Sequence, residues 1–530
     1  MKAKQKYLYN ALLLTAVTLL MRTVTVSFNV YVSNRAGAEA MGLLALISGV
    51  YGFAVTVATS GIQLATVRTV AERLERTEGA ENKKCVLSCI GYATFFGSIA
   101  TLLLFFLARP IGHLLLRDAR TVRALRTLSF TLLPIAISAV LNGYFTAVRR
   151  AWKNAVTQVT EQGVKIALTT YFLLVVAPKT VEGSLLAILL GGAVAESLSL
   201  LLNLVLYQLD KRHFRHVKIA TPSLSTGKKV GVTAIALPVA ISAYMRSGLL
   251  AIEHILIPRG LSRYGSGNTA ALAAYGSLQS MALPVILYPA AILSSFSSLL
   301  IPEMTEQQAA GNKREIRYIA GRVYQMTLLF SIGVGGVMFF LSGELGQVLY
   351  HSDEVGIFIR RLAPLIPIMY LDTATDGMLK GLGQQVYSMN VNIIDALISV
   401  IAVAVLVPHM GISGYILTIY ITEIFNAACS VARLLRITGF RPRLTLLFLR
   451  PLLSVIGATC TVNILLHFLP IGRYSGGALI GHILLTALFY LAFLLFTGGL
   501  GRADINWLHH SLLPKKRKRP PSIPSSRAAV

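Results

Sequence analysis

The stretch ALLLTAVTLLMRTVTVSFNV, residues 11–30, is as long as one membrane crossing and carries a single charge, Arg22. A helix of about 20 residues spans the hydrocarbon core of a bilayer. Comparable runs recur almost to residue 498, and the 530-residue chain is 55% hydrophobic and 13% charged, with a mean hydropathy of +0.66. Only helices and closed barrels satisfy their backbone polar groups inside lipid, and these runs are too long and continuous for barrel strands. The sequence therefore predicts an all-α polytopic membrane protein.

The apolar runs predict about fourteen transmembrane helices. Their centres lie near residues 20, 50, 97, 135, 166, 196, 242, 285, 330, 370, 397, 424, 457 and 487. The basic start MKAKQK resembles part of a signal peptide, but the run behind it is too long for one and lacks a clear small-residue cleavage site. We expect this run to stay attached as the first helix.

Lys and Arg are distributed unevenly along the chain, whose net charge is +27. They concentrate in alternate connections, on the side that holds the N-terminus, as they do in cytoplasmic loops. This pattern places both termini in the cytoplasm and explains the positive charge without nucleic acid. The tail PKKRKRPPSIPSSR, residues 514–527, resembles a nuclear-localisation run, but we favour a juxtamembrane anchor on anionic lipid.

Two distant stretches align with each other, NGYFTAVRRAWKNAVTQVTEQ from Asn142 and DGMLKGLGQQVYSMNVNIIDA from Asp376. We call the spacing from Asn142 to Asp376 the repeat offset. The same offset pairs Glu161 with Asp395, Gly42 with Gly276, and Glu72 with Glu306. Recurrence at one offset argues for a duplicated unit. Each copy would hold six helices, an even number, so both copies enter the membrane from the same side and are related by an axis along the membrane normal.

The repeat predicts the domain organisation. We expect an N-terminal six-helix lobe over residues 1–225, a C-terminal six-helix lobe over 226–440, two additional transmembrane helices over 441–500 and a basic cytoplasmic tail over 501–530. In transporters built from such repeats the substrate site lies between the lobes.

Arg22 is the most informative charge inside the predicted membrane segments, because burying an ionisable residue there costs at least about 2.5–3.5 kcal/mol. It shares a helix face with Thr15, Thr18, Thr25 and Asn29, and no acid in that run neutralises it. We favour a cavity-facing ligand for an anion. An arginine bonded to the backbone carbonyls of a neighbouring helix remains the alternative.

Two further runs carry charges that are candidates for the same cavity. Lys165 follows Glu161 at i,i+4, the favourable order for an ion pair, so a structural pair is as open as a functional one. Arg246 and Glu253 stand two turns apart on the seventh run and face the expected seam between the lobes. The candidate substrate-binding residues are therefore Arg22, Asn29, Lys165, Arg246 and Glu253.

A second set of charges is a candidate ion-coupling site. Asp372, Asp376 and Lys380 follow one another at i, i+4 and i+8 on the tenth run, and Asp395 lies in the next run. Carboxylates on one helix face can bind a coupling cation, Na⁺ or H⁺. They can equally pair with Lys380 and nearby arginines, so both interpretations stay open.

The rest of the sequence offers no covalent chemistry. It has no P-loop or other nucleotide motif, and HILIPRG, residues 254–260, and GNKREIR, residues 311–317, are interpreted as loop boundaries without a nucleophile. The four cysteines form no CxxC pair, so we expect no metal site. Glu196 and Glu423 are lone acids without an assignable role. We expect a protein that is not an enzyme and has no cofactor, and a cationic cavity of this kind predicts a carrier of anionic solutes or lipids.

Several segments in combination resemble the stage V sporulation protein B group. They are NRAGAEAMGLLALISGVYGFAVTVATSGI at 34–62, the segment at 142–162, IPRGL at 257–261, MALPVILYPAAILSSFSSLLIPEMTEQQAAGN at 281–312 and GMLKGLGQQ at 377–385. That group belongs to the polysaccharide and lipid-linked oligosaccharide flippases of the multidrug/oligosaccharidyl-lipid/polysaccharide (MOP) superfamily, whose MATE-like fold has two six-helix lobes. The resemblance implies a bacterial cytoplasmic-membrane flippase that moves an undecaprenyl-diphosphate-linked cell-wall or polysaccharide precursor by alternating access.

The resemblance also bears on individual residues. The related lipid II flippases hold a diphosphate with arginines in a central cavity, and Arg22 falls at the position of a basic residue of the family. A guanidinium grips phosphate oxygens with two parallel hydrogen bonds. Where family members commonly have a second basic residue two turns later, this chain has Phe28 and Asn29, so Lys165 and Arg246 are candidates to complete the charge.

Two other functions stay open. A cation-coupled multidrug extruder of the same superfamily would want carboxylates deep in the N-terminal lobe, and the first two runs hold none. A non-transporting scaffold would recruit cell-wall synthesis proteins through the basic cytoplasmic loops. The expected partners are an anionic lipid-linked saccharide, membrane lipids and, for a scaffold, those synthesis proteins.

Overall fold

The computed structural model describes residues 2–500, apart from 60, 75–78, 149, 177–179, 215–231, 266, 440–444 and 468–475. This part of the chain is helical and contains no strand, so the predicted all-α class is confirmed. The predicted domain boundaries at 225/226 and 440/441 and the tail 501–530 lie outside the described residues.

The first half of the chain forms α1 (Lys2–Thr59), α2 (Ile62–Leu74), α3 (Gly79–Pro110), η1 (Ile111–Leu115), α4 (Arg120–Ala147), α5 (Ala151–Tyr171), η2 (Phe172–Val176) and α6 (Val181–Phe214). The second half forms α7 (Val232–Arg263), α8 (Asn268–Gly276), η3 (Ser277–Ala282), α9 (Leu283–Leu287), α10 (Ala290–Ala309), α11 (Lys313–Phe340), α12 (Ser342–Tyr350), α13 (Asp353–Leu362), η4 (Ala363–Leu365), α14 (Ile366–Gly381), α15 (Gln385–Met410) and α16 (Ile412–Thr438). The last elements are η5 (Thr445–Leu449), α17 (Arg450–His467) and α18 (Gly476–Phe496).

Each of the fourteen predicted centres lies in a helical segment. The centres near 20 and 50 lie in one helix, α1, on either side of Gly37, whose φ of 82° breaks the helix with a conformation that suits glycine. Within the described ranges, eleven segments are long and apolar enough to cross a membrane, and the polar α5 is not among them. The count of fourteen spans therefore stays a prediction.

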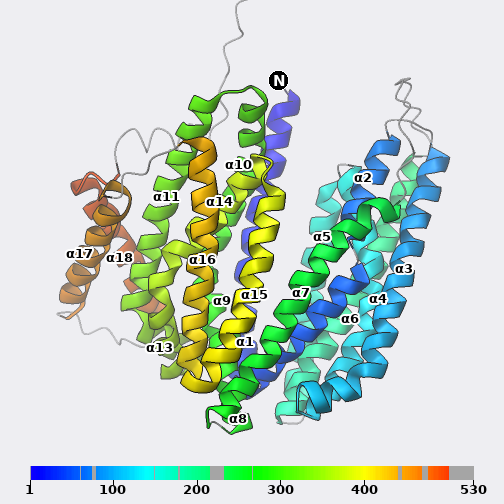
Figure 1. Cartoon of the computed structure of the whole chain (residues 1–530), viewed down its shortest axis with the longest axis horizontal. Helices are drawn as coiled ribbons and strands as arrows, with labels where there is room; N and C mark the ends of the chain where they lie inside the picture. The colour runs from blue at the N-terminus through cyan, green and yellow to red at the C-terminus, as the bar shows by residue number, and fades with distance from the viewer. Residues whose placement is uncertain are drawn as a thin grey trace, which may run out of the picture.

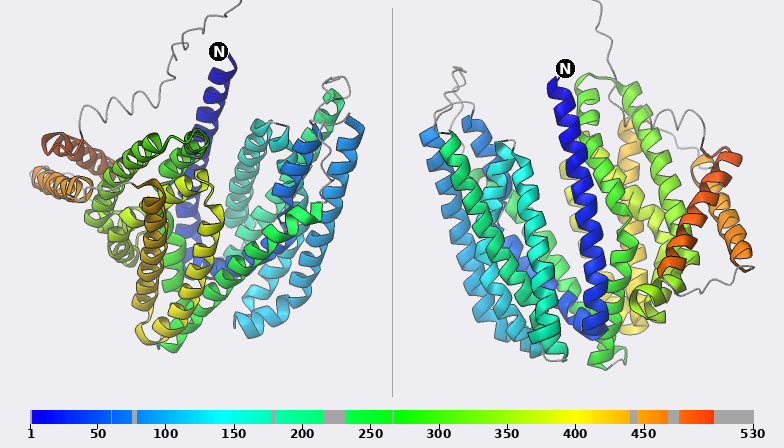
Figure 2. Two further views of the ribbon diagram at one scale, coloured as in Figure 1. Left: turned by 45° about the horizontal axis from the view of Figure 1, so that its top comes forward. Right: turned by 180° about the vertical axis from the view of Figure 1, so that it is seen from behind.

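The helices form two groups that meet at one end and diverge toward the end where the N-terminus lies (Figure 1). We call α1–α6 the first lobe and α7–α16 the second lobe. Seen from behind, the first half of α1 lies beside the helices of the second lobe (Figure 2), to which Asn29 and Asn34 hydrogen-bond. Helix α7 in turn runs up beside the first lobe (Figure 1), where Ser247 accepts from Thr56. The pair α17 and α18 lies at the outer edge of the second lobe, where both helices pack against α11.

The predicted repeat is visible in the helix boundaries. Helices α3 and α11 begin one repeat offset apart, as do α5 and α15, and helices α4 and α14 end one repeat offset apart. Arg117 and His351, also separated by that offset, have φ values of 55° and 52°, and no other described non-glycine residue has a positive φ. Helix boundaries and one unusual backbone conformation therefore recur at the repeat offset in the two lobes.

Gly42 of α1 and Gly276 of α8 mark the axis that relates the copies. A Cβ added to Gly42 would overlap the carbonyl oxygen of Leu272, and a Cβ added to Gly276 would overlap that of Ala38. These two contacts are the same contact shifted by the repeat offset. Reciprocal contact between equivalent residues is the signature of a two-fold relation, so the axis passes between α1 and α8, where the two backbones touch.

One interpretation of the sequence is wrong. HILIPRG, expected at a loop boundary, lies inside α7, which continues through Pro258 to Arg263. Proline is tolerated in membrane helices because neighbouring groups satisfy the backbone that it frees. GNKREIR does mark a boundary, since the side chain of Asn312 accepts from the backbone N–H of Glu315 and caps α11.

Candidate functional site

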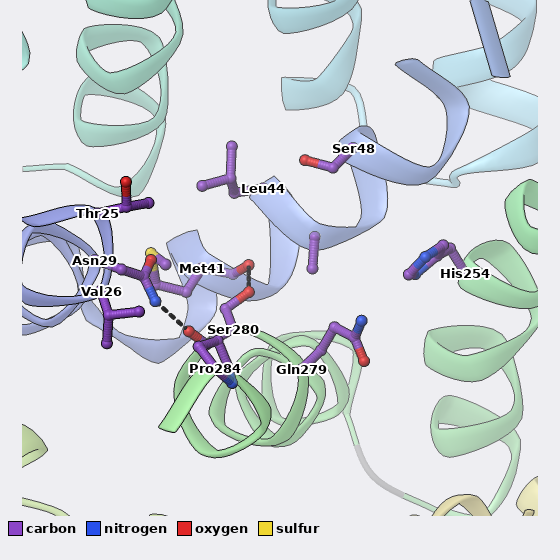
Figure 3. Close-up of a pocket in the computed structure, with 11 residues that line it drawn as sticks. Thr25, Val26, Asn29, Met41, Leu44, Ser48, His254, Gln279, Ser280 and Pro284 are labelled. Carbon is purple, nitrogen blue, oxygen red and sulfur yellow. Dashed lines mark hydrogen bonds between the residues drawn. The ribbon is translucent and has the colours of Figure 1, made fainter. Parts of the chain in front are cut away.

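A cavity of about 440 Å³ lies beside the break in α1, between the two lobes (Figure 3). Its walls come from α1 on both sides of Gly37, from α7, and from η3 and α9. Its polar lining residues are Thr25, Asn29, Ser48, His254, Gln279 and Ser280. We call it the kink cavity, and its position matches the expected place for a site between repeats.

Hydrogen bonds fix the walls of the kink cavity. Asn29 Nδ2 donates to the carbonyl oxygen of Ser280 at 2.7 Å, and Ser280 Oγ donates to the carbonyl oxygen of Met41 at 3.1 Å. Gln279 Oε1 accepts from the hydroxyl of Tyr415 at 2.9 Å. Asn29 therefore joins the first half of α1 to the second lobe as well as lining the cavity.

Arg22 lies on the same face of α1 as the cavity residues Thr25 and Asn29, one and two turns before them. Its side chain is exposed. Its charge acts electrostatically on the hydroxyl of Tyr370 in α14 of the second lobe. Among the side chains that the structure describes, none forms a hydrogen bond or an ion pair with Arg22. The guanidinium is thus available to a ligand next to the cavity.

Arg246 and Glu253 of α7 belong to a different neighbourhood. Helix α7 packs against α15, and Glu253 lies near the hydroxyl of Ser399 in that helix. Asp395, also in α15, interacts electrostatically with Glu253 and Arg246. The structure therefore joins two predicted substrate-binding residues to one predicted ion-coupling residue.

The predicted carboxylates of α14 differ in their partners. Asp376 pairs with Lys380 at 2.6 Å and accepts from Ser388, so its charge is compensated locally. Asp372 lies near the hydroxyl of Ser430. However, Asp372 and Asp395 each keep one buried carboxylate oxygen without a partner among the described residues.

Glu423 of α16 completes this group, since it interacts electrostatically with both Asp372 and Asp395. The sequence revealed Glu423 only as a lone acid, because nothing in it shows that α7, α14, α15 and α16 converge. We call Glu253, Asp372, Asp395 and Glu423 the acidic cluster. In the described part of the chain, no three His, Cys, Asp or Glu residues are placed to hold a metal ion together.

Lys165 lies within the first lobe, apart from Arg22. Glu161 accepts from Ser199 at 2.8 Å, and both Glu161 and Lys165 interact electrostatically with Glu196. Glu161 and Lys165 form no direct ion pair. Of the five predicted substrate-binding residues, Arg22 and Asn29 are therefore associated with the kink cavity, and the other three are distributed between two other groups. His254, Gln279 and Ser280 line the cavity without having been singled out from the sequence.

Comparison with family models gives two matches. The model described as polysaccharide biosynthesis protein matches residues 7–306, and the MatE model matches residues 261–406. The first match covers more than half of the chain and includes most of α1, the kink cavity and the rest of the first lobe.

Individual proteins agree with this assignment. Stage V sporulation protein B of Bacillus subtilis is 27% identical over 422 residues, which cover 79% of this chain and 81% of that protein. The structure of the lipid II flippase MurJ in an inward closed conformation superposes with a TM-score of 0.68 at 14% identity, covering 92% of this chain and 98% of that one. An inward-facing MATE family multidrug resistance transporter of the MOP superfamily gives 0.59 at 16% identity, over 80% and 98% of the two chains. The chain belongs to the polysaccharide biosynthesis protein family.

Proposed function

We propose that this protein is a flippase that moves a lipid-linked oligosaccharide, carried on undecaprenyl diphosphate, across the bacterial cytoplasmic membrane. The observation that carries the proposal is Arg22: an exposed guanidinium on the cavity face of α1, with no hydrogen bond or ion pair to a described side chain. A membrane arginine without a carboxylate partner suits an anionic ligand. Its planar fork matches phosphate oxygens in a bidentate manner.

The kink cavity supplies the rest of the proposed headgroup site. Thr25, Asn29, Gln279 and Ser280 offer neutral hydrogen-bonding groups of the kind that sugar hydroxyls require. A volume of about 440 Å³ suits a headgroup rather than a polyprenyl chain, so the chain would stay in the bilayer. Lys165 and Arg246 lie in other groups, and we propose for them only a supporting electrostatic role.

Two observations support a carrier that is open toward the cytoplasm in this structure. The concentration of Lys and Arg in alternate connections supports a cytoplasmic N-terminus, and the two helix groups diverge toward the N-terminal end (Figure 1). With both termini cytoplasmic, this arrangement corresponds to a carrier that receives its substrate from the cytoplasmic side. Alternating access would then close this end and open the other.

The test is binding of an undecaprenyl-diphosphate saccharide to purified protein in nanodiscs, at several salt concentrations. Because a hydrogen bond to a charged group contributes about 1.5–3 kcal/mol, Arg22→Ala should weaken binding by about tenfold to a hundredfold. Arg22→Lys, which keeps the charge but loses the fork, should fall between. Arg109→Ala is the matched control, since Arg109 is also exposed but lies in the last turn of α3, which does not line the cavity. Equal binding by Arg22→Ala and wild type would remove the proposed role of Arg22.

Ion coupling through the acidic cluster is a second part of the proposal. Asp372 and Asp395 are the better candidates, because their unpartnered carboxylate oxygens are available to Na⁺ or H⁺, whereas Asp376 already pairs with Lys380. The same cluster is the specific observation in favour of the alternative function, a cation-coupled drug extruder. Drug resistance conferred on a pump-deficient host, with no binding of lipid-linked saccharide, would support that alternative.

A further inference from the structure

A second cavity, of about 380 Å³, lies at the end of the molecule opposite the N-terminus. It sits where α7 ends and α8 begins, against the connection between η1 and α4. Three arginines line it: Arg117 from the first lobe, and Arg259 and Arg263 from the second. We call it the arginine cavity.

The charge in this cavity is not balanced by acids. The charges of Arg117 and Arg263 both act on Arg259, and no carboxylate lines the cavity. The nearby carboxylates Asp118 and Glu39 are both engaged by Arg120, at 2.7 and 2.8 Å. Three like charges that converge in one hollow repel one another, so the arrangement favours an anion between them.

Polar atoms in the wall also remain without partners. Arg259 Nε and Ser262 Oγ are buried and form no hydrogen bond with any described residue. The other end of the Arg259 guanidinium is occupied, since Nη2 donates to the carbonyl oxygens of Leu114, at 2.8 Å, and Leu115. Nη2 of Arg259 is therefore used in a structural contact, whereas Nε is a donor without an acceptor among the described residues. Buried donors normally find an acceptor.

The repeat shows that the fold does not require these cations. The equivalents of Arg259 and Arg263 in the first lobe, one repeat offset earlier, are Thr25 and Asn29, which line the kink cavity. The same backbone positions thus build a cavity wall in both lobes, once with neutral groups and once with two arginines. The left-handed backbone of Arg117 recurs at His351, so it belongs to the repeat rather than to the ligand.

We propose that the arginine cavity is a second anion site, which binds a phosphate group at the membrane surface opposite the N-terminus. The phosphate comes either from the headgroup of an anionic phospholipid or from a diphosphate that has left the membrane plane. Arg117 belongs to one lobe and Arg259 and Arg263 to the other, so a bound phosphate bridges the lobes and favours the state in which this end is closed. The proposal does not depend on what Arg22 binds.

The test uses the full-length protein with Arg117→Asn and Arg263→Asn combined. Asparagine tolerates the left-handed conformation at 117, and at 263 it copies the residue of the equivalent position in the first lobe. Arg259 is left intact because it caps η1. A thermal unfolding midpoint close to that of wild type establishes that the double variant is folded.

Two probes distinguish the sources of phosphate. In the first experiment, sodium pyrophosphate is titrated into protein held in phosphatidylcholine nanodiscs. In the second, the protein is exchanged into phosphatidylcholine, and native mass spectrometry counts the phosphatidylglycerol molecules that it retains. We expect the double variant to lose at least about tenfold in affinity for one probe, as the loss of charge-assisted hydrogen bonds requires, while Arg109→Ala keeps it, because Arg109 lines neither cavity. Loss of phosphatidylglycerol retention alone assigns the site to a lipid headgroup, and loss of pyrophosphate affinity assigns it to a diphosphate.

The proposal is overturned if wild type binds neither probe, or if the double variant binds both as wild type does. If Arg22→Ala alone abolishes pyrophosphate binding, the anion site lies at the kink cavity only, which removes this inference and leaves the proposed function standing.

Discussion

The two lobes share a backbone but not a chemistry. Thr25 and Asn29 in the first lobe and Arg259 and Arg263 in the second occupy equivalent positions, and each pair lines a cavity between the lobes. The residues just before and at the start of the equivalent helices α5 and α15 also differ. In the first lobe Lys153 and Arg150 bind the buried Asp210, whereas in the second lobe Gln384, the equivalent of Arg150, accepts from Arg433 at 2.7 Å.

This difference separates what the duplicated fold needs from what each copy has acquired. Positions that are alike in both lobes, such as Gly42 and Gly276, carry the architecture. Positions that differ, such as Asp372, whose equivalent is Ser138, and Arg22, whose equivalent is Leu256, are free of that demand and are the better candidates for function.

The largest effect is expected at the axis. Gly42→Ala and Gly276→Ala each place a Cβ on a backbone carbonyl, and because backbone cannot yield as a side chain does, each should cost about 4 kcal/mol, beyond the usual range of overpacking. Thermal unfolding in detergent measures this. Gly52→Ala, where a Cβ meets nothing within 4 Å, should be neutral or slightly stabilising. Unequal losses at the two axial glycines would contradict the reciprocal contact.

The buried ion network of the first lobe comes next. The side chain of Asp210 is 1% exposed and binds Lys153 at 2.7 Å, so Asp210→Ala leaves a buried cation uncompensated and should cost about 3 kcal/mol. Gln384→Ala in the second lobe removes only hydrogen bonds to the half-buried Arg433 and should cost about 1.5 kcal/mol. Equal losses of unfolding free energy in the same assay would show that the ion network of Asp210 and the hydrogen bonds of Gln384 stabilise their lobes equally.

Variants of the acidic cluster and a variant of the neighbouring Asp376 should differ in how strongly transport depends on an ion gradient. Asp372→Asn and Asp395→Asn should each reduce the dependence of substrate movement on an imposed Na⁺ or H⁺ gradient by at least about tenfold, since each removes a charge worth more than about 1.4 kcal/mol to a bound cation. Asp376→Asn, which breaks only the pair with Lys380, should leave gradient dependence in place. Movement into proteoliposomes with and without a gradient is the measurement, and an unchanged response in the first two variants removes the coupling proposal.

The smallest effect is expected on the surface of the first lobe. Arg123, whose side chain is 76% exposed, pairs with Glu182 at 3.1 Å, and exposed pairs contribute less than about 1 kcal/mol. The equivalent residue in the second lobe is the uncharged Ile357, which is 50% exposed. Arg123→Ala should therefore shift the unfolding midpoint only slightly. A loss as large as that of Asp210→Ala would mean that this pair holds the lobe together.

The sequence predicts the helices and the duplication because both depend on local or periodic information. Segment length and hydropathy locate the helices, and the offset between Asn142 and Asp376, which recurs elsewhere, reveals the copies. The groups formed by the charges depend on contacts between distant helices. Glu423 could not be joined to Asp372, nor Glu253 to Asp395, without knowing how α7, α14, α15 and α16 pack. The stretch HILIPRG, which contains Arg259, is interpreted from the sequence as a loop boundary, whereas α7 continues through it to Arg263.

The backbone contact at Gly42 and Gly276 also sets the mechanical properties of the molecule. At Gly42 and Gly276 the two helix backbones touch with no side chain between them. The helices can therefore tilt about this contact without repacking a side chain between them, and the contact can serve as a pivot near one end of the molecule. A helix of 28 residues such as α11 is about 42 Å long. A rotation of one lobe by about 10° about this contact would displace the far end of such a helix by about 7 Å, on the scale of a saccharide ring.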